Sequence, residues 1–112
     1  VVVSSYSRPL PAVNLAEVLA TSDLPGGVVN ILTGNAATIA PWLASHMDVN
    51  AIDLTGIAGD TALASELEVA AADNLKRVRR APASEPDWTQ DPGLEPMTAF
   101  LEIKTVWHPM GV

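Results

Sequence analysis

The sequence contains no cysteine. This absence excludes disulfide bonds, a thiolate nucleophile and zinc sites of the cysteine type, and it fits a reducing compartment, so we expect a cytoplasmic protein. No apolar run approaches the roughly 18 residues of a membrane span, so we predict no membrane partner. Val1–Val3 lacks the basic flank of a signal peptide and reads as a strand entered midway, and we expect the chain to be a piece of something longer.

Basic side chains are also scarce. Six lysines and arginines face 13 acidic residues, which gives a formal net charge of −7. Nucleic acid is therefore a poor partner, because phosphate backbones bind clustered lysine and arginine. The one basic cluster lies at residues 76–80, after an acidic helix, and we interpret it as a solvated helix end that complements the helix dipole. A functional patch is the alternative.

Familiar catalytic motifs are missing too, since the chain has no GxGxxG, P-loop, GxSxG or HExxH pattern. His46 and His108 stand far apart in the sequence, and we predict no catalytic residue and no metal site. Asp53 falls within an apolar strand, where we interpret it as pointing outward, with a functional carboxylate as the alternative. The 48% hydrophobic content nevertheless predicts a folded core.

Strand and helix patterns alternate along residues 1–80. The predicted strands are Val1–Val3, Val28–Leu32 and Asn50–Leu54, with a short extended stretch at Lys76–Arg80. The predicted helices are Leu10–Thr21, Ala36–His46 and Asp60–Asn74. Pro41 suits the second helix only if that helix begins late or kinks. This alternation with short links predicts an α/β fold of parallel βαβ units that share one sheet.

The character of the chain changes after residue 80. Residues 81–96 are rich in proline and acidic side chains and are typical of a surface linker. Residues 97–112 follow as a third part, in which Met97–Trp107 is strand-capable. We therefore divide the chain into an α/β unit, a linker and a C-terminal strand.

Two strand-to-helix turns carry the clearest binding potential. Thr33–Ala36 and Thr55–Ala58 both place small residues before a helix, where free backbone N–H groups and the positive dipole end favour a phosphate. Ligands of parallel sheets also bind beyond the carboxyl ends of the strands. The alternative is that each glycine only permits a tight turn.

Four segments resemble the NAD(P)-dependent aldehyde dehydrogenases. Residues 24–34 (LPGGVVNILTG) are similar to that family's "LPxGVVN" strand and glycine turn, and residues 46–56 (HMDVNAIDLTG) to its "H..V..I.FTGS" segment. Residues 70–78 (AAADNLKRV) resemble its "AA.xNLKRV", and residues 100–106 (FLEIKTV) its "Y.E.KTV" tail. The resemblance implies a partial Rossmann-like cofactor domain, NAD or NADP as cofactor, and a C-terminal oligomerisation-type strand.

The resemblance also implies a cofactor-binding set, which is Ser4, Gly34, Thr55, Gly56 and Ile57. Ser4 falls at about the place of a family lysine that contacts the ribose of the nucleotide. Ile57 replaces a serine near the pyrophosphate and cannot donate the same hydrogen bond, so cofactor binding is expected to be weakened.

The family's catalytic groups do not occur in these 112 residues. Its nucleophile is a cysteine, and its "ELGGK" glutamate is missing because residues 79–84 read RRAPAS after Arg77–Val78. We therefore expect a non-catalytic scaffold that forms a homo-oligomer or a hetero-oligomer with an intact aldehyde dehydrogenase. The alternatives are a segment of an active enzyme whose cysteine and glutamate lie on another chain, a small nucleotide-binding module, or a remnant without function.

Overall fold

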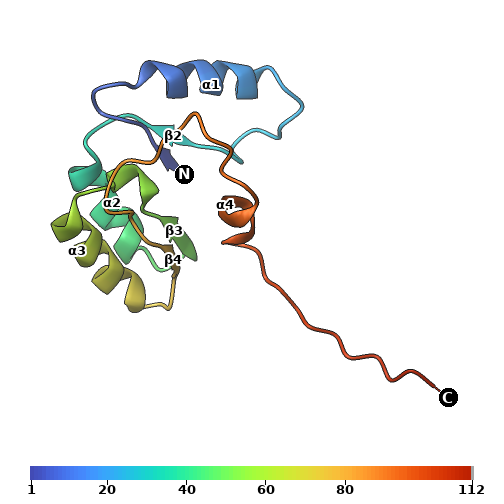
Figure 1. Ribbon diagram of the computed structural model, residues 1–112. Helices are drawn as coiled ribbons and strands as arrows, with labels where there is room; N and C mark the ends of the chain where they lie inside the picture. Colours follow the sequence, from blue (N-terminus) through green and yellow to red (C-terminus); the bar gives the residue numbers. More distant parts are fainter. Residues whose placement is uncertain (112) are drawn as a thin grey trace.

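The computed structural model describes residues 1–111, which form an α/β arrangement of short strands and helices (Figure 1). The elements in chain order are β1 (Val2–Val3), α1 (Leu10–Ala20), β2 (Ile31–Leu32), α2 (Ala36–Ser45), β3 (Ala51–Asp53), the 3-10 turn η1 (Thr55–Ile57), α3 (Thr61–Ala72), β4 (Arg77–Arg79) and α4 (Glu95–Thr98). The α/β class is confirmed, with the strands and helices in the predicted order up to β4.

The four strands pair as two parallel βαβ units. Strand β1 pairs with β2, with Val2 opposite Ile31, and α1 connects them. Strand β3 pairs with β4, with Asp53 opposite Arg79, and α3 connects them. The prediction of one shared sheet is wrong for residues 1–111, where these pairs are separate two-stranded sheets. Strands β1 and β3 line opposite parts of one cavity, and this space separates the two sheets.

Strand β2 is shorter than the predicted Val28–Leu32 because the preceding turn extends to Asn30. Gly27 has a φ of +84°, and the Val28 N–H donates to the Pro25 carbonyl at 3.4 Å. The Asn30 side chain then donates to the Gly27 carbonyl at 3.0 Å. These local bonds keep Val28 and Val29 out of the sheet. The Asn30 carbonyl already accepts a hydrogen bond from the Val2 N–H at 2.8 Å, and Ile31–Leu32 form the strand itself.

Helix α2 begins at its predicted residue in spite of Pro41. The Asn35 side chain caps it by accepting a hydrogen bond from the Ala37 N–H at 2.9 Å. Pro41 lies inside the continuous helix, which begins at the predicted Ala36 and not at a later residue. The Ser45 hydroxyl donates to the Pro41 carbonyl at 2.9 Å in the last turn.

Helix α3 is capped by Asp60, whose carboxylate accepts a hydrogen bond from the Leu63 N–H at 3.1 Å. It ends at Ala72, and Leu75 then adopts a φ of +56° that turns the chain into β4. The basic cluster at residues 76–80 therefore lies beyond the helix. Our interpretation of it as a helix end is wrong.

The core lies between α2, α3 and the β3–β4 sheet. Ala40 and Ala44 of α2 face Leu54 and Leu67, and Leu67 is fully buried. Because the α2 contribution is alanine, the two helices can approach closely around one large side chain. This small core positions the carboxyl end of β3 and the turn that follows it.

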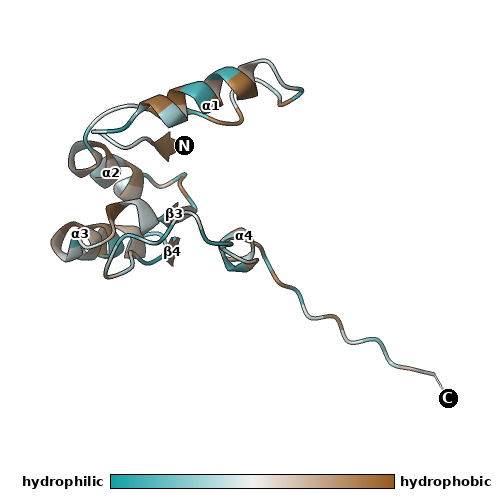
Figure 2. Ribbon diagram, turned by 45° about the horizontal axis from the view of Figure 1, so that its top comes forward, coloured by the Kyte–Doolittle hydropathy of each residue, from teal (hydrophilic) through white to brown (hydrophobic). Residues whose placement is uncertain are grey.

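Helix α1 lies outside this core. Every residue of α1 is exposed or half-buried, and its apolar side chains include Leu10 at 71% exposed and Val18 at 63%. Figure 2 shows apolar and polar residues interleaved along α1 at the outer margin of the molecule. The helical period is as predicted, but its apolar stripe is left largely uncovered in the single chain.

The C-terminal part departs from prediction. Residues 95–98 form the single turn α4, with Pro96 in its first turn, and residues 99–111 make no strand within the described part of the chain. The predicted strand at residues 97–112 is thus not formed here, because a strand needs an edge to pair with, and Figure 1 shows this segment leaving the body. Val112, its last residue, lies outside the described residues. No helix of residues 1–111 is long and apolar enough to cross a membrane.

Candidate binding cavity

A cavity of about 1040 Å³ lies between the two sheets. Strand β1 and Ser4 line one wall, and β3 with η1 lines another. The first residues of α2 and Trp88 of the linker also contribute to the lining. The cavity therefore brings together the carboxyl ends of β1 and β3 and the N-terminus of α2, which is where parallel βαβ units bind ligands.

Four of the five predicted cofactor-binding residues line this cavity: Ser4, Thr55, Gly56 and Ile57. Gly34 is not among the described residues that line it, although Asn35 and Ala36 directly after it are. Gly34 has a φ of +149° and redirects the chain from β2 into α2. The observed role of Gly34 is thus structural, and the binding role of all five residues remains a prediction.

Ser4 carries the clearest unsatisfied group at the cavity. Its N–H donates to the Leu32 carbonyl at 2.9 Å, which extends the β1–β2 ladder by one bond. Its side-chain hydroxyl is buried and has no hydrogen-bond partner among the described residues, and Ser4 is only 6% exposed. Leaving a buried hydroxyl unpaired costs about 1–3 kcal/mol, so a polar group entering here would gain a partner.

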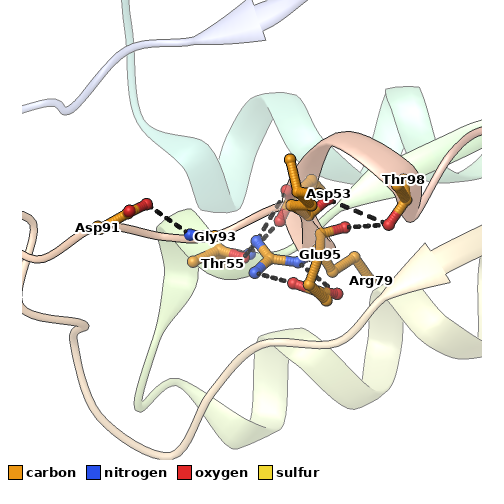
Figure 3. Close-up of polar contacts among 8 residues, drawn as sticks. Asp53, Thr55, Arg79, Asp91, Gly93, Glu95 and Thr98 are labelled. Atoms are coloured by element: carbon orange, nitrogen blue, oxygen red, sulfur yellow. Dashed lines mark hydrogen bonds and ion pairs between the residues drawn. The ribbon is translucent and has the colours of Figure 1, made fainter.

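The opposite wall is occupied by an internal polar network (Figure 3). The Asp53 carboxylate accepts a hydrogen bond from the Thr55 N–H at 2.8 Å. The Arg79 guanidinium donates from Nη1 to Asp53 Oδ2 at 3.2 Å and to Thr55 Oγ1 at 2.6 Å. Asp53 is exposed, in agreement with our interpretation, and its carboxylate also pairs with Arg79, which stands opposite it in the β3–β4 register.

This network lowers the pKa of Asp53. Partial burial acts against the charged form and raises the pKa, but the hydrogen bonds from Thr55 and from Arg79, together with the positive charge of Arg79, outweigh it. The carboxylate is therefore ionised at neutral pH and holds both the turn and the guanidinium.

The lowered pKa predicts an acid-dependent contribution to stability. Because the folded pKa lies below the ordinary value of 3.8, the contribution is present above that value and is lost as the pH falls through the folded pKa. We expect Asp53→Asn to remove it, about 0.2–1 kcal/mol for a screened surface pair. Urea unfolding measured between about pH 2 and pH 6 tests this. Asp23→Asn, at an exposed position, should keep the full pH slope, and an unchanged slope in Asp53→Asn would contradict the assignment.

Known proteins match this chain over the part that contains the βαβ units. The model of the aldehyde dehydrogenase family matches residues 1–81, which run from β1 through β4. The chain belongs to the aldehyde dehydrogenase family. It is 44% identical over 71 residues to a mitochondrial aldehyde dehydrogenase of Leishmania tarentolae, covering 62% of this chain and 14% of that relative.

Mammalian relatives give similar alignments. Aldehyde dehydrogenase 1A1 of Mus musculus is 38% identical over 78 residues, and cytosolic aldehyde dehydrogenase 1 of Elephantulus edwardii is 37% identical over 79 residues. Each alignment covers 70% of this chain and 15% of the relative. The aligned part thus spans about one-seventh of the length of these curated relatives. No solved structure matches the chain.

The cavity fits a dinucleotide only in part. Ser4 and the α2 N-terminus offer polar groups, although Asn35 already caps the Ala37 N–H. Within the turn at Thr55–Ile57, the Thr55 N–H donates to the Asp53 carboxylate at 2.8 Å and the Ile57 N–H donates to the Leu54 carbonyl at 3.1 Å, so neither N–H is free to bind a phosphate. The residues of this turn therefore do not fit the pyrophosphate of NAD or NADP.

Arg79 was missed as a site residue in the sequence. The sequence feature that could have indicated Arg79 is its charge, which is opposite to that of Asp53 on the neighbouring strand. The two residues are recognised as partners only once the β3–β4 register is known. Glu95, which also binds Arg79, gave no signal, because it lies in a linker without periodicity.

Proposed function

We propose that this member of the aldehyde dehydrogenase family acts as a non-catalytic scaffold that associates with itself or with an intact aldehyde dehydrogenase. The observation that carries the proposal is the uncovered surface of the single chain. Its accessible area is 8784 Å², whereas a compact monomer of 11.7 kDa exposes roughly 5900 Å². Its radius of gyration is 16.9 Å, against about 13 Å for a compact domain of this length.

Open strand edges support the same proposal. Among residues 1–111 each strand pairs with one other strand, so each sheet keeps two edges with free backbone groups. The apolar face of α1 adds exposed hydrophobic area of the kind that partner surfaces cover.

The C-terminal segment supplies an element that could pair with such an edge. Leu101 and Ile103 alternate with Glu102 and Lys104, which is the two-residue period of a strand with one apolar face, and the alternation ends at Thr105–Val106. We propose that this segment adds to the sheet edge of a neighbouring chain as the oligomerisation strand.

Light scattering of the chain, alone and mixed with an intact aldehyde dehydrogenase from the same source, tests the proposal. We expect a discrete oligomer or a mixed complex, and Ile103→Lys should weaken it at least about tenfold because a charge would be buried at the new ladder. The matched control is Lys104→Ile on the opposite face of the segment. A folded monomer that does not bind the dehydrogenase would contradict the scaffold proposal.

An alternative is that the chain is one segment of an active oxidoreductase that acts on aldehydes with NAD(P). Family membership and the one-seventh share of the relatives' length favour it. Mixing with a chain that carries the cysteine and glutamate would then generate NAD(P)-dependent aldehyde oxidation that neither part shows alone.

A small nucleotide-binding module is the other alternative, and the cavity with the unpaired Ser4 hydroxyl favours it. Titration of the chain with NAD and NADP separates it from the scaffold, since saturable binding by the monomer is expected only of the module. For all three functions we propose the cytoplasm as the location, because a chain without cysteine suits a reducing compartment.

A further inference from the structure

Two arginines of β4 hold a segment from the far end of the chain. Arg77 donates to the Phe100 carbonyl at 3.0 Å and to the Glu102 carboxylate at 3.1 Å. Arg79 donates from Nη2 to Glu95 Oε2 at 2.9 Å and from Nε to Glu95 Oε1 at 3.4 Å. We call residues 95–102 the strap. Arg77 and Arg79 are two residues apart on one strand, so they share a face of the sheet.

The Arg79–Glu95 contact has the geometry of a two-point carboxylate receptor. One edge of the guanidinium, Nε and Nη2, faces both oxygens of a single carboxylate, as Figure 3 shows. The remaining nitrogen, Nη1, is fixed by Asp53 and Thr55 of the body. The body therefore orients the fork independently of the strap, and this fork matches a carboxylate or a phosphate.

The strap itself is weakly attached. Every residue of α4 is exposed or half-buried, so its attachment depends on the two arginines more than on apolar packing. The side chains of Glu95 and Glu102 are each 66% exposed. Exposed ion pairs contribute only about 0.2–1 kcal/mol each, so an external anion can compete with them.

The local charge favours an anion once the strap leaves. With the strap docked, Arg77 and Arg79 face three carboxylates, from Asp53, Glu95 and Glu102. Without the two strap carboxylates the same face holds two guanidinium groups and one carboxylate, a net charge of +1. The nearby Arg80 pairs with Glu68 and adds no net charge to this face.

We propose that Arg77 and Arg79 form a receptor for a small carboxylate or phosphate anion, and that the strap is an internal ligand that covers it. Because Arg79 is bonded to Asp53 and Thr55, which line the cavity, an anion on the receptor lies at the rim of that cavity. The receptor is independent of the scaffold proposed above.

The test titrates the full chain with succinate and, separately, with inorganic phosphate, and follows binding by calorimetry. The double variant Glu95→Gln/Glu102→Gln should bind about two- to thirtyfold tighter than the unaltered chain, the factor for releasing two exposed ion pairs. Hydrogen exchange of residues 95–102 should become faster in the same variant. The two titrations show whether the receptor takes carboxylate or phosphate.

Two further variants guard the interpretation. Glu17→Gln/Glu66→Gln changes the net charge equally at exposed positions of α1 and α3 and should leave the affinity unchanged. Arg79→Lys, added to the Glu95→Gln/Glu102→Gln variant, keeps the positive charge but removes the two-point guanidinium fork. The affinity for the anion should therefore fall at least about tenfold, and circular dichroism should show an unchanged fold. The proposed receptor would be contradicted if the unaltered chain and the Glu95→Gln/Glu102→Gln variant bound the anion equally well. It would also be contradicted if Arg79→Lys left the affinity unchanged.

Discussion

Leu67→Ala is expected to lower the free energy of unfolding by about 2–5 kcal/mol. Leu67 is the largest fully buried side chain, with none of its surface exposed, and it packs on α3 against Ala40, Ala44 and Leu54. Two of these neighbours are alanines, which cannot move to fill the space that the substitution leaves. The cost should therefore lie in the upper part of the range for a buried leucine.

Urea unfolding followed by far-ultraviolet circular dichroism measures this change. Val69→Ala, on the same helix but 72% exposed, is the matched control and should change the free energy of unfolding by about 0.5 kcal/mol or less. Equal effects of the two substitutions would show that α3 does not pack on α2 in solution and that the core is assigned wrongly.

The elements up to β4 were predictable because their signals are local. Helix α2 begins at the predicted Ala36 and α3 begins one residue after the predicted start, because the Asn35 and Asp60 side chains cap them. Helix α1 ends at Ala20, one residue before the predicted end, where the Thr21 hydroxyl donates to the Glu17 carbonyl at 3.0 Å. Such signals act over a few residues, so they do not depend on the tertiary arrangement of the rest of the chain.

Long-range arrangement was not predictable in the same way. A sequence pattern does not say whether two βαβ units share a ladder, and here a cavity separates β1 from β3. The strap depends on pairs separated by 16 residues, for Arg79 with Glu95, and by 25 residues, for Arg77 with Glu102. No periodicity in the linker marks these partners, because their contacts are charge pairs at a tertiary surface.

The candidate site has features that the sequence predicts and features that it does not. Ser4 and Thr55–Ile57 come together because each follows the carboxyl end of a strand, which topology alone places near the same ligand region. The carboxylate that caps the second turn, Asp53, was not foreseen as a competitor of a phosphate. Its effect depends on a hydrogen bond from the Thr55 N–H, and this bond became visible only in three dimensions.

Gly34→Ala is expected to destabilise the chain by about 1–3 kcal/mol, the range for a residue held in a sparsely populated backbone conformation. Gly34 has a φ of +149°, which side chains with a Cβ atom rarely adopt. A Cβ atom there would also lie 2.8 Å from Ile39 Cδ1, too close for an unstrained contact. Since Gly34 joins β2 to the capped start of α2, the strain falls on the wall of the cavity that Asn35 and Ala36 provide.

Thermal unfolding of a small series separates the two causes. Gly26→Ala is the control, because no atom lies within 4 Å of its added Cβ, and its effect should stay within about 0.5 kcal/mol. Adding Ile39→Val to Gly34→Ala removes the terminal carbon that the new Cβ meets, so it should recover the steric part and leave the backbone part. If Gly34→Ala behaves like Gly26→Ala, the turn can relax to an ordinary conformation, and Gly34 is then a permissive turn residue that does not fix the α2 end of the cavity.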